Sequence, residues 1–170
     1  LGCAEAGRDV RLRPGQEYEA LAKTLFARFG LAEGRPLIGI APGAAYGPAK
    51  KWFPDRFAAV VDRLLDDAEG QAIQLGSAGD AETTGQVQQS ARHRLVDAAG
   101  KTNLREAIAL IARCSLFLSN DSGLMHIAGA LGVPTIALFG STNPATTAPA
   151  GDRSVVIRRA VPCSPCLKKV

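Results

Sequence analysis

The sequence has few aromatic residues, few cysteines and no long apolar run. Phe, Trp and Tyr account for 5% of its 170 residues, which leaves little to stack on nucleic-acid bases. No uninterrupted apolar stretch approaches the ~20 residues that a membrane-spanning helix needs, and residues 1–13 lack the basic-then-apolar order of a signal peptide. We therefore expect no nucleic-acid partner, no membrane-spanning segment and, by default, a cytoplasmic location.

A concentrated block of positive charge is also missing. The formal net charge is +4 and the basic residues are spread along the chain, so a dedicated nucleic-acid surface is not indicated. A small anionic ligand, such as a nucleotide, fits the sign of the charge. The length and the balance of apolar and charged residues suit one globular domain. Because the chain begins at Leu1 rather than at a methionine and stops at Val170 just after a cysteine-rich turn, we expect a fragment of a longer protein.

Four cysteines are too few for a disulfide framework. Cys3 and Cys114 stand far apart, whereas Cys163 and Cys166 form a CSPC turn. A structural zinc site needs four ligands and no second pair is visible, so no metal is expected within this chain. Two interpretations of the CSPC turn stay open: a tight turn with reduced thiols, or a metal or disulfide role completed by residues outside the chain.

Apolar runs alternate with helical stripes from residue 36 onward. Spacing predicts strands at Leu37–Ala41, 72–75, 95–98, 116–119 and Thr135–Phe139, and helices at Gln16–Phe29, after Pro54, and over 80–92, 104–112 and 122–131. Continuously apolar strands separated by helices are typical of a parallel sheet buried on both faces. We predict an α/β, Rossmann-like parallel sheet flanked by helices over residues 36–170, preceded by a linker and leading helix over 1–35.

In such sheets, ligands bind beyond the carboxyl ends of the strands. After the first strand comes PGAAYGPAKKW, residues 42–52, which is not a Walker motif. Its small residues leave room for a ligand to contact backbone N–H groups, and Lys50 and Lys51 supply a cation that can hold a pyrophosphate. The alternative is a flexible surface loop with two solvated lysines.

The second and third strand ends carry weaker signals. After the second strand comes GSAGDAE, residues 76–82, in which Asp80 or Glu82 can accept hydrogen bonds from ribose hydroxyls or serve as a helix cap. The third strand ends at a glycine turn, residues 99–102, whose backbone at Thr102 can contact a base. Its alternative is a plain turn in which Thr102 or Asn103 caps the next helix.

The sharpest signal is SNDSGLMHIAGALGVP, residues 119–134. Asp121 or Ser122 can cap a helix whose small residues, beginning at Gly123, allow close packing and an anion at its amino end. A carboxylate beside bound phosphates would repel them, so we expect Asp121 to orient sugar hydroxyls or to cap the helix. His126 lies one turn into the helix and can either face the same site or be structural.

The loop after the last predicted strand is GSTNPATTAP, residues 140–149. Its hydroxyl groups and prolines suit either a ligand-facing lip or a plain surface connection. The sequence leaves both alternatives open.

Together, the four strand-end motifs resemble those of the ADP-heptose:lipopolysaccharide heptosyltransferases, glycosyltransferase family 9. PGAAYGPAKKW, GSAGDAE, GKTNL and NDSGLMHIAGALGVPTIALFGSTNP stand in the family's order and spacing, most like heptosyltransferase II, over about residues 37–166. The resemblance implies a GT-B architecture of two facing Rossmann-like domains. In it, the C-terminal domain, here residues 36–170, holds ADP-heptose, and an absent N-terminal domain holds the lipid-linked lipopolysaccharide core acceptor at the inner face of the inner membrane.

The resemblance also implies roles for particular residues. Lys50 corresponds to a contact to the phosphates or the sugar, Asp80 to the acidic ribose position and Thr102 to the adenine-side turn. The remaining implied donor-binding residues are Ala45 and Tyr46 in the phosphate-side loop, and Asp121, Ser122, Gly123 and His126 at the pyrophosphate and heptose.

The implied reaction is an inverting heptosyl transfer without a metal or other cofactor. A carboxylate base from the N-terminal domain activates the acceptor hydroxyl, while Lys50 and the helix end at Ser122 stabilise charge on the departing diphosphate. Lys50 and Asp121 are therefore the candidate catalytic residues of this chain. We expect the chain alone to bind ADP weakly and not to turn over.

Three other functions remain as alternatives. Another GT-B transferase or an NDP-sugar epimerase also places nucleotides at strand ends and would differ in its preference for UDP over ADP. A receiver-like module with Asp121 as phosphoacceptor is disfavoured, because receiver domains cluster several acidic residues and Leu37–Ala41 brings no acidic pair.

Overall fold

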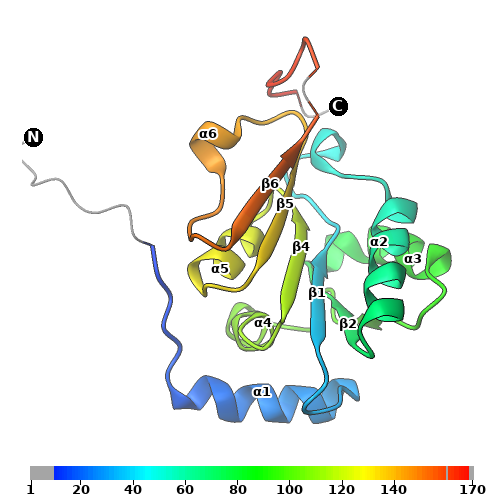
Figure 1. The fold of residues 1–170 in the computed structure, drawn as a ribbon, viewed down its shortest axis with the longest axis vertical. Helices are drawn as coiled ribbons and strands as arrows, with labels where there is room; N and C mark the ends of the chain where they lie inside the picture. The colour runs from blue at the N-terminus through cyan, green and yellow to red at the C-terminus, as the bar shows by residue number, and fades with distance from the viewer. Residues whose placement is uncertain (1–9, 160, 169–170) are drawn as a thin grey trace, which may run out of the picture.

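A computed structural model describes residues 10–159 and 161–168. They form one parallel six-stranded sheet in the order β3-β2-β1-β4-β5-β6, with helices on both faces (Figure 1). The strands are β1 (Leu37–Ala41), β2 (Gln71–Gln74), β3 (Val96–Asp97), β4 (Leu116–Asn120), β5 (Thr135–Phe139) and β6 (Ser154–Arg158). The helices are α1 (Gln16–Phe29), α2 (Pro54–Asp67), α3 (Ala81–Ser90), α4 (Leu104–Ile111), α5 (Gly123–Ala130) and α6 (Pro144–Thr147), with 3-10 turns η1 (Pro48–Lys50) and η2 (Ala78–Asp80).

Alternate residues of the buried strands face opposite layers of helices. Leu37 of β1 belongs to the core shared with α1, α4 and α5, whereas Ile38 and Ile40 pack with α2 and α3. All five residues of β1 are buried, as expected for a central strand covered on both faces. Gly39 is required there, because a Cβ at this position would lie 2.6 Å from the ring of Phe117.

Helix α1 packs into the same core as the sheet. Its Ala22, Leu25 and Phe26 are buried, and Arg28 reaches across to α4, where it pairs with Glu106 at 3.0 Å. The helix ends at Gly30, whose φ of 67° is the left-handed conformation that favours glycine. The leading helix is therefore a structural part of the sheet's core.

Cys114 is buried in this core. Burial raises the pKa of its thiol to about 12, and the thiol donates to the carbonyl of Leu110 at 3.4 Å. Such a thiol stays protonated at neutral pH and packs as a small apolar group. Cys3 lies outside the described residues.

The strand order creates a topological switch between β1 and β4. From β1 the chain moves outward through β2 and β3, and from β4 it moves outward in the other direction through β5 and β6. Loops that follow β1 and β4 therefore diverge at the carboxyl ends of these strands, which is where open α/β sheets bind ligands.

The predicted α/β class is confirmed. The bounds of Gln16–Phe29, Leu37–Ala41 and Thr135–Phe139 agree with the prediction, and the other predicted elements shift by a few residues. Besides the two 3-10 turns, the prediction missed β6, an edge strand whose Val155, Val156 and Ile157 are exposed, and the single turn α6. No helix of the described residues is long and apolar enough to cross a membrane.

Candidate functional site

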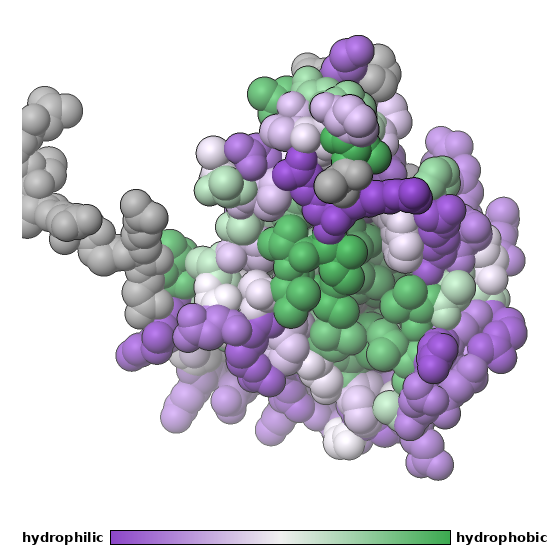
Figure 2. Space-filling model, turned by 45° about the horizontal axis from the view of Figure 1, so that its top comes forward, coloured by the Kyte–Doolittle hydropathy of each residue, from purple (hydrophilic) through white to green (hydrophobic). Residues whose placement is uncertain are grey.

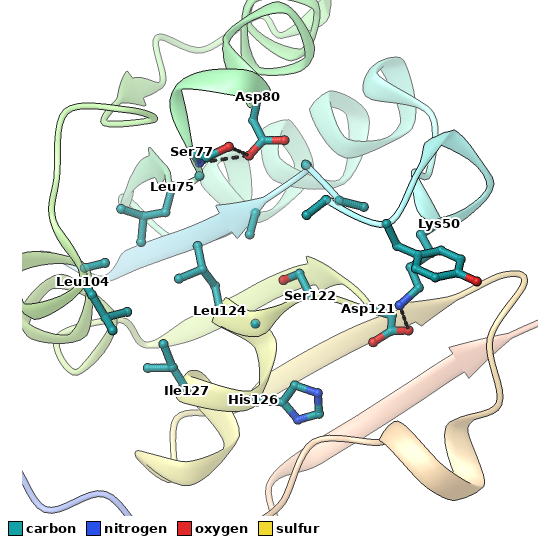
Figure 3. A pocket seen from close by; sticks show the side chains of 18 of the residues that line it. Lys50, Leu75, Ser77, Asp80, Leu104, Asp121, Ser122, Leu124, His126 and Ile127 are labelled. Atoms are coloured by element: carbon teal, nitrogen blue, oxygen red, sulfur yellow. Dashed lines mark hydrogen bonds and ion pairs between the residues drawn. The ribbon is translucent and has the colours of Figure 1, made fainter. Parts of the chain in front are cut away.

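A cleft of about 710 Å³ opens at the carboxyl ends of the strands, at the switch between β1 and β4. Of the predicted site residues, Glu82 and Lys51 do not line it. The cleft brings together Ala45, Tyr46, Lys50, Asp80, Thr102, Asp121, Ser122, Gly123 and His126 from four separate loops (Figure 3). The Lys50 loop and the amino end of the α5 helix thus line the same cleft, as the prediction that both hold one diphosphate requires.

An ion pair between Lys50 and Asp121 lies at one side of the cleft (Figure 3). The Lys50 ammonium lies 2.6 Å from Oδ2 of Asp121, and the two side chains are 14% and 5% exposed. The ring of Tyr46 covers the same ammonium, with its centroid 4.9 Å from Nζ. The lysine ends η1, after β1, and the aspartate directly follows β4, so the adjacency of these strands makes the pair.

Asp121 is held from β5 as well as by Lys50. Its backbone N–H donates to the carbonyl of Leu138 at 3.1 Å, and the hydroxyl of Thr142 donates to Oδ2 at 2.6 Å. Thr142, in the loop after β5, is itself buried. Sequence reasoning left this loop as either a lip or a plain connection and missed Thr142; the only signal was its dense set of hydroxyl residues.

The N-cap of α5 is Ser122, whose hydroxyl accepts from the backbone N–H of Met125 at 3.4 Å and lies 2.9 Å from the hydroxyl of Ser119. The suggestion that Asp121 caps the helix is wrong, because its carboxylate is engaged by Lys50 and Thr142 instead. Gly123 begins the helix and is exposed. The amino end of α5 therefore presents N–H groups and the positive end of the helix dipole to the cleft.

Asn120 fixes the loop that carries Lys50. This fully buried side chain donates from Nδ2 to the carbonyl of Pro42 at 2.7 Å and accepts through Oδ1 from the backbone N–H of Trp52 at 3.0 Å. One amide therefore ties down both ends of the 42–52 loop. Sequence reasoning did not single out Asn120, although it directly precedes Asp121 in the NDSG motif.

Asp80 joins two strand ends. Its Oδ2 accepts from the N–H and the hydroxyl of Ser77, at 2.9 and 2.8 Å, in a capping box. Its Oδ1 lies against Gly43, where an added Cβ would come within 2.1 Å of that oxygen. The Asp80 carboxylate thus caps the 3-10 turn η2 and makes no side-chain cap hydrogen bond to α3, and it also lines the cleft.

Glu82 and Lys51 stand close to site residues in the sequence but point away from the cleft. Glu82 accepts from Gln86 along α3, at 3.3 Å, and does not reach the cleft. Lys51 donates to the hydroxyl of Thr83 at 3.1 Å and is not a second cation of the cleft. Successive residues of a helical turn point in different directions, so a neighbour in sequence need not share a site.

The side of the cleft away from Lys50 is apolar. Leu75, Leu104, Leu124 and Ile127 gather there in Figure 3. Figure 2 looks onto this end of the sheet and shows hydrophobic side chains in its centre with hydrophilic ones around them. Thr102 and Asn103 also line the cleft, and Asn103 caps α4 in a box with Glu106.

The CSPC turn lies beside the Lys50 loop. Leu167 donates its N–H to the carbonyl of Ser141 at 2.8 Å and accepts from the Tyr46 hydroxyl at 2.8 Å. Cys163 is exposed and Cys166 half-buried, and both thiols are free. Within residues 10–159 and 161–168, no three His, Cys, Asp or Glu side chains are grouped to hold a metal ion.

Comparisons with known proteins agree with this architecture. The chain is 42% identical to lipooligosaccharide heptosyltransferase 2 of Haemophilus influenzae over 154 residues, 88% of this chain and 44% of that protein. It is 40% identical to lipopolysaccharide heptosyltransferase 2 of Escherichia coli over 77% of this chain and 38% of that protein. The solved structure of E. coli ADP-heptose lps heptosyltransferase II superposes with a TM-score of 0.81 and 35% identity, over 88% of this chain and 45% of that one.

The chain thus spans less than half the length of these relatives. The comparisons give no support to the epimerase or receiver alternatives. The model of glycosyltransferase family 9 (heptosyltransferase) matches residues 5–170, nearly the whole chain. This chain therefore belongs to glycosyltransferase family 9, the heptosyltransferases.

Proposed function

We propose that this chain is the C-terminal, donor-binding domain of a heptosyltransferase that transfers heptose from ADP-heptose to the inner core of lipopolysaccharide. The observation that carries the proposal is the convergence of Lys50 and the amino end of α5 on one cleft at the switch point of the sheet. A nucleotide diphosphate needs a cation, directed N–H groups and an apolar place for its base. The cleft offers each of these.

The donor is oriented by the polarity of the cleft. The adenine lies on the apolar side beside Leu104, Leu124 and Thr102, with the ribose toward Asp80. The diphosphate lies between Lys50 and the N–H groups that open α5. The heptose then lies toward Asp121 and His126, where a carboxylate oxygen can accept sugar hydroxyls.

A carboxylate near phosphates would repel them, and the ion pair with Lys50 reduces that repulsion. Lys50 pairs with Asp121, so this carboxylate is compensated and does not act on a nearby anion as an isolated negative charge. A diphosphate carries more charge than a carboxylate and draws Lys50 toward its oxygens. As ADP leaves, the lysine and the helix end stabilise the negative charge that builds on it, without a metal ion.

The remaining parts of the reaction belong to the rest of the protein. The base that deprotonates the acceptor hydroxyl comes from the N-terminal domain, which also holds the lipid-linked acceptor. That acceptor brings the enzyme to the inner face of the inner membrane. Robust heptosyl transfer by this chain alone would contradict the assignment of the base to the other domain.

Calorimetric titration of this chain with ADP, UDP and GDP tests the proposal. ADP should bind better than the other two, and Lys50→Ala should weaken ADP binding about ten- to a hundredfold, because a hydrogen bond to a charged group contributes about 1.5–3 kcal/mol. Lys51→Ala is the matched control: it removes the neighbouring cation, which contacts Thr83 outside the cleft, and should leave ADP affinity unchanged. Equal affinity of wild type and Lys50→Ala would show that the site is misplaced, and a preference for UDP would favour another transferase.

A further inference from the structure

We propose that Thr142 is a positioning residue of the donor site, whose hydroxyl holds the Asp121 carboxylate in place when Lys50 turns to the diphosphate. The inference rests on the proposed function, since it needs an anion that competes with Asp121 for the lysine. It assigns a role to the loop after β5, which carries none of the predicted site residues.

The contacts of Asp121 divide into a fixed set and a movable one. Its backbone N–H and its Oδ2 are both held from β5 and the loop after it, by Leu138 and Thr142. Lys50 contacts the same Oδ2 from the other side of the switch point. Oδ1 has no hydrogen-bond partner in the described part of the chain and is available to a ligand hydroxyl.

Thr142 is the smaller and more rigid of the two donors to Oδ2. Its side chain is β-branched, the residue is 7% exposed, and its chain neighbour Ser141 accepts the N–H of Leu167. Lysine has a long flexible stem whose ammonium can move between partners. If a diphosphate draws Lys50 away, Thr142 is the donor that stays.

The energetic consequence follows from the burial of Asp121. A buried carboxylate without a partner is strongly unfavourable, so in the absence of Thr142 the aspartate would retain Lys50 against the incoming phosphates. Either the lysine stays with Asp121 and the phosphates lose their cation, or it leaves and the carboxylate remains uncompensated. Both outcomes weaken the binding of a diphosphate.

Other threonines of the same loop have ordinary structural roles. Thr146 and Thr147 both donate to the backbone carbonyl of Asn143 within the turn that opens α6. Thr146 is exposed and does not line the cleft. It therefore provides a matched control for the loss of one threonine hydroxyl from this loop.

The first test is titration of the 170-residue chain with ADP. Thr142→Val keeps the shape of the side chain and removes the hydroxyl, and should weaken ADP binding roughly tenfold. Thr142→Ser restores a donor and should bind within about twofold of wild type, as should Thr146→Val. Thermal unfolding of each variant establishes that it is folded, and Thr142→Ala replaces the valine variant if that one is not.

The second test is a double-mutant cycle with Asp121→Ala. If Thr142 acts through the carboxylate, Thr142→Val should change ADP affinity in the wild-type background and leave it unchanged in the Asp121→Ala background. An equal loss in both backgrounds, or no rescue by serine, would overturn the positioning role. Failure of the wild-type chain to bind ADP would instead overturn the proposed function itself, so the two failures are distinguishable.

Discussion

Two buried aspartates show how the same ion-pair chemistry serves stability at one end of the sheet and binding at the other. Asp62, in α2, and Asp121, after β4, are 4% and 5% exposed, and each has a cation beside it. Asp62 accepts the backbone N–H groups of Arg92 and His93, at 2.9 to 3.1 Å, through both of its oxygens. Asp121 uses one oxygen for two side-chain donors and lines a cleft.

The difference lies in whether the donors can move. Backbone N–H groups are fixed by the fold, so Asp62 ties the turn after α3 to α2 permanently. The Lys50 ammonium can move from Asp121 to a ligand while Thr142 keeps its hydrogen bond in our proposal, and the second oxygen of Asp121 is left for a ligand. The contacts of Asp62 therefore suit a structural role, whereas the spare oxygen and lysine partner of Asp121 suit the binding role that we propose for it.

The largest effect expected from this comparison is on Asp62. Asp62→Ala leaves the N–H groups of Arg92 and His93 without their acceptor, and should lower the free energy of unfolding by about 3 kcal/mol. Asp121→Ala should cost less stability than Asp62→Ala. Its main effect should be on ADP binding, because Lys50 no longer has a carboxylate to pair with. Urea unfolding and ADP titration of both variants measure the two effects, and the comparison fails if Asp121→Ala unfolds as easily as Asp62→Ala.

The fold could be predicted from sequence where burial leaves a simple pattern. Leu37–Ala41 and Thr135–Phe139 are short apolar runs between turn residues, and both are buried central strands with the expected bounds. The edge strand β6 was missed, because its run Val155–Ile157 is short and is exposed rather than covered by helices. A sequence shows apolar spacing, but it does not show which strand lies at an edge.

The location of the candidate site could be predicted from the rule that ligands bind beyond the carboxyl ends of parallel strands. Lys50 and Asp121 follow different strands, and the rule places both at the same edge of the sheet. Their direct pairing could not be predicted, since it requires β1 to lie beside β4, with β2 and β3 on the other side of β1. Thr142 was missed for the same reason, because its contact with Asp121 depends on β5 lying beside β4.

The prediction also placed two residues in the cleft that do not line it, and the cause lies in the local turn. Glu82 and Lys51 each stand one or two positions from a residue that lines the cleft, and both point away from it. Composition at a strand end identifies the loop, whereas the direction of each side chain depends on the turn that the loop adopts. The 3-10 turns η1 and η2 set that direction here.

Acid should weaken the contacts that Asp62 and its neighbour Asp66 make with Arg92 and His93. Burial raises the pKa of Asp62, but the N–H groups of Arg92 and His93 and the Arg92 charge outweigh it and hold that pKa below its ordinary value of 3.8. Hydrogen bonds from Arg92 and His93 lower the pKa of Asp66 as well. A lowered pKa in the folded state contributes stability that is present above pH ~3.8 and is lost as the pH falls through the folded pKa.

The measurement is the free energy of unfolding as a function of pH. Wild type should lose stability as the pH falls from about 5 to 3, and Asp66→Asn should show a shallower slope because one of the two carboxylates no longer titrates. Asp55→Asn is a suitable control, because that carboxylate is exposed and takes no part in the contacts with Arg92 and His93, so its removal should leave the slope unchanged. A steeper slope in Asp66→Asn would contradict the assignment.

The smallest expected effect concerns Tyr46. It tests whether the Lys50 ammonium is held rigidly by Tyr46 and the C-terminal turn or can move between partners. Tyr46→Phe removes the hydrogen bond to the Leu167 carbonyl but keeps the ring over the Lys50 ammonium. Because Tyr46 is 40% exposed, the lost hydrogen bond should lower stability by about 0.5–1 kcal/mol, and ADP affinity should change less than about threefold. Tyr46→Ala also removes the ring and should weaken ADP binding more, because a cation–π contact at an exposed site contributes about 0.5–1 kcal/mol. Suppose instead that Tyr46→Phe weakened ADP binding as much as Lys50→Ala. The lysine would then depend on the contact between Tyr46 and Leu167, and the distinction between the fixed contacts of Asp62 and a movable Lys50–Asp121 pair would not stand.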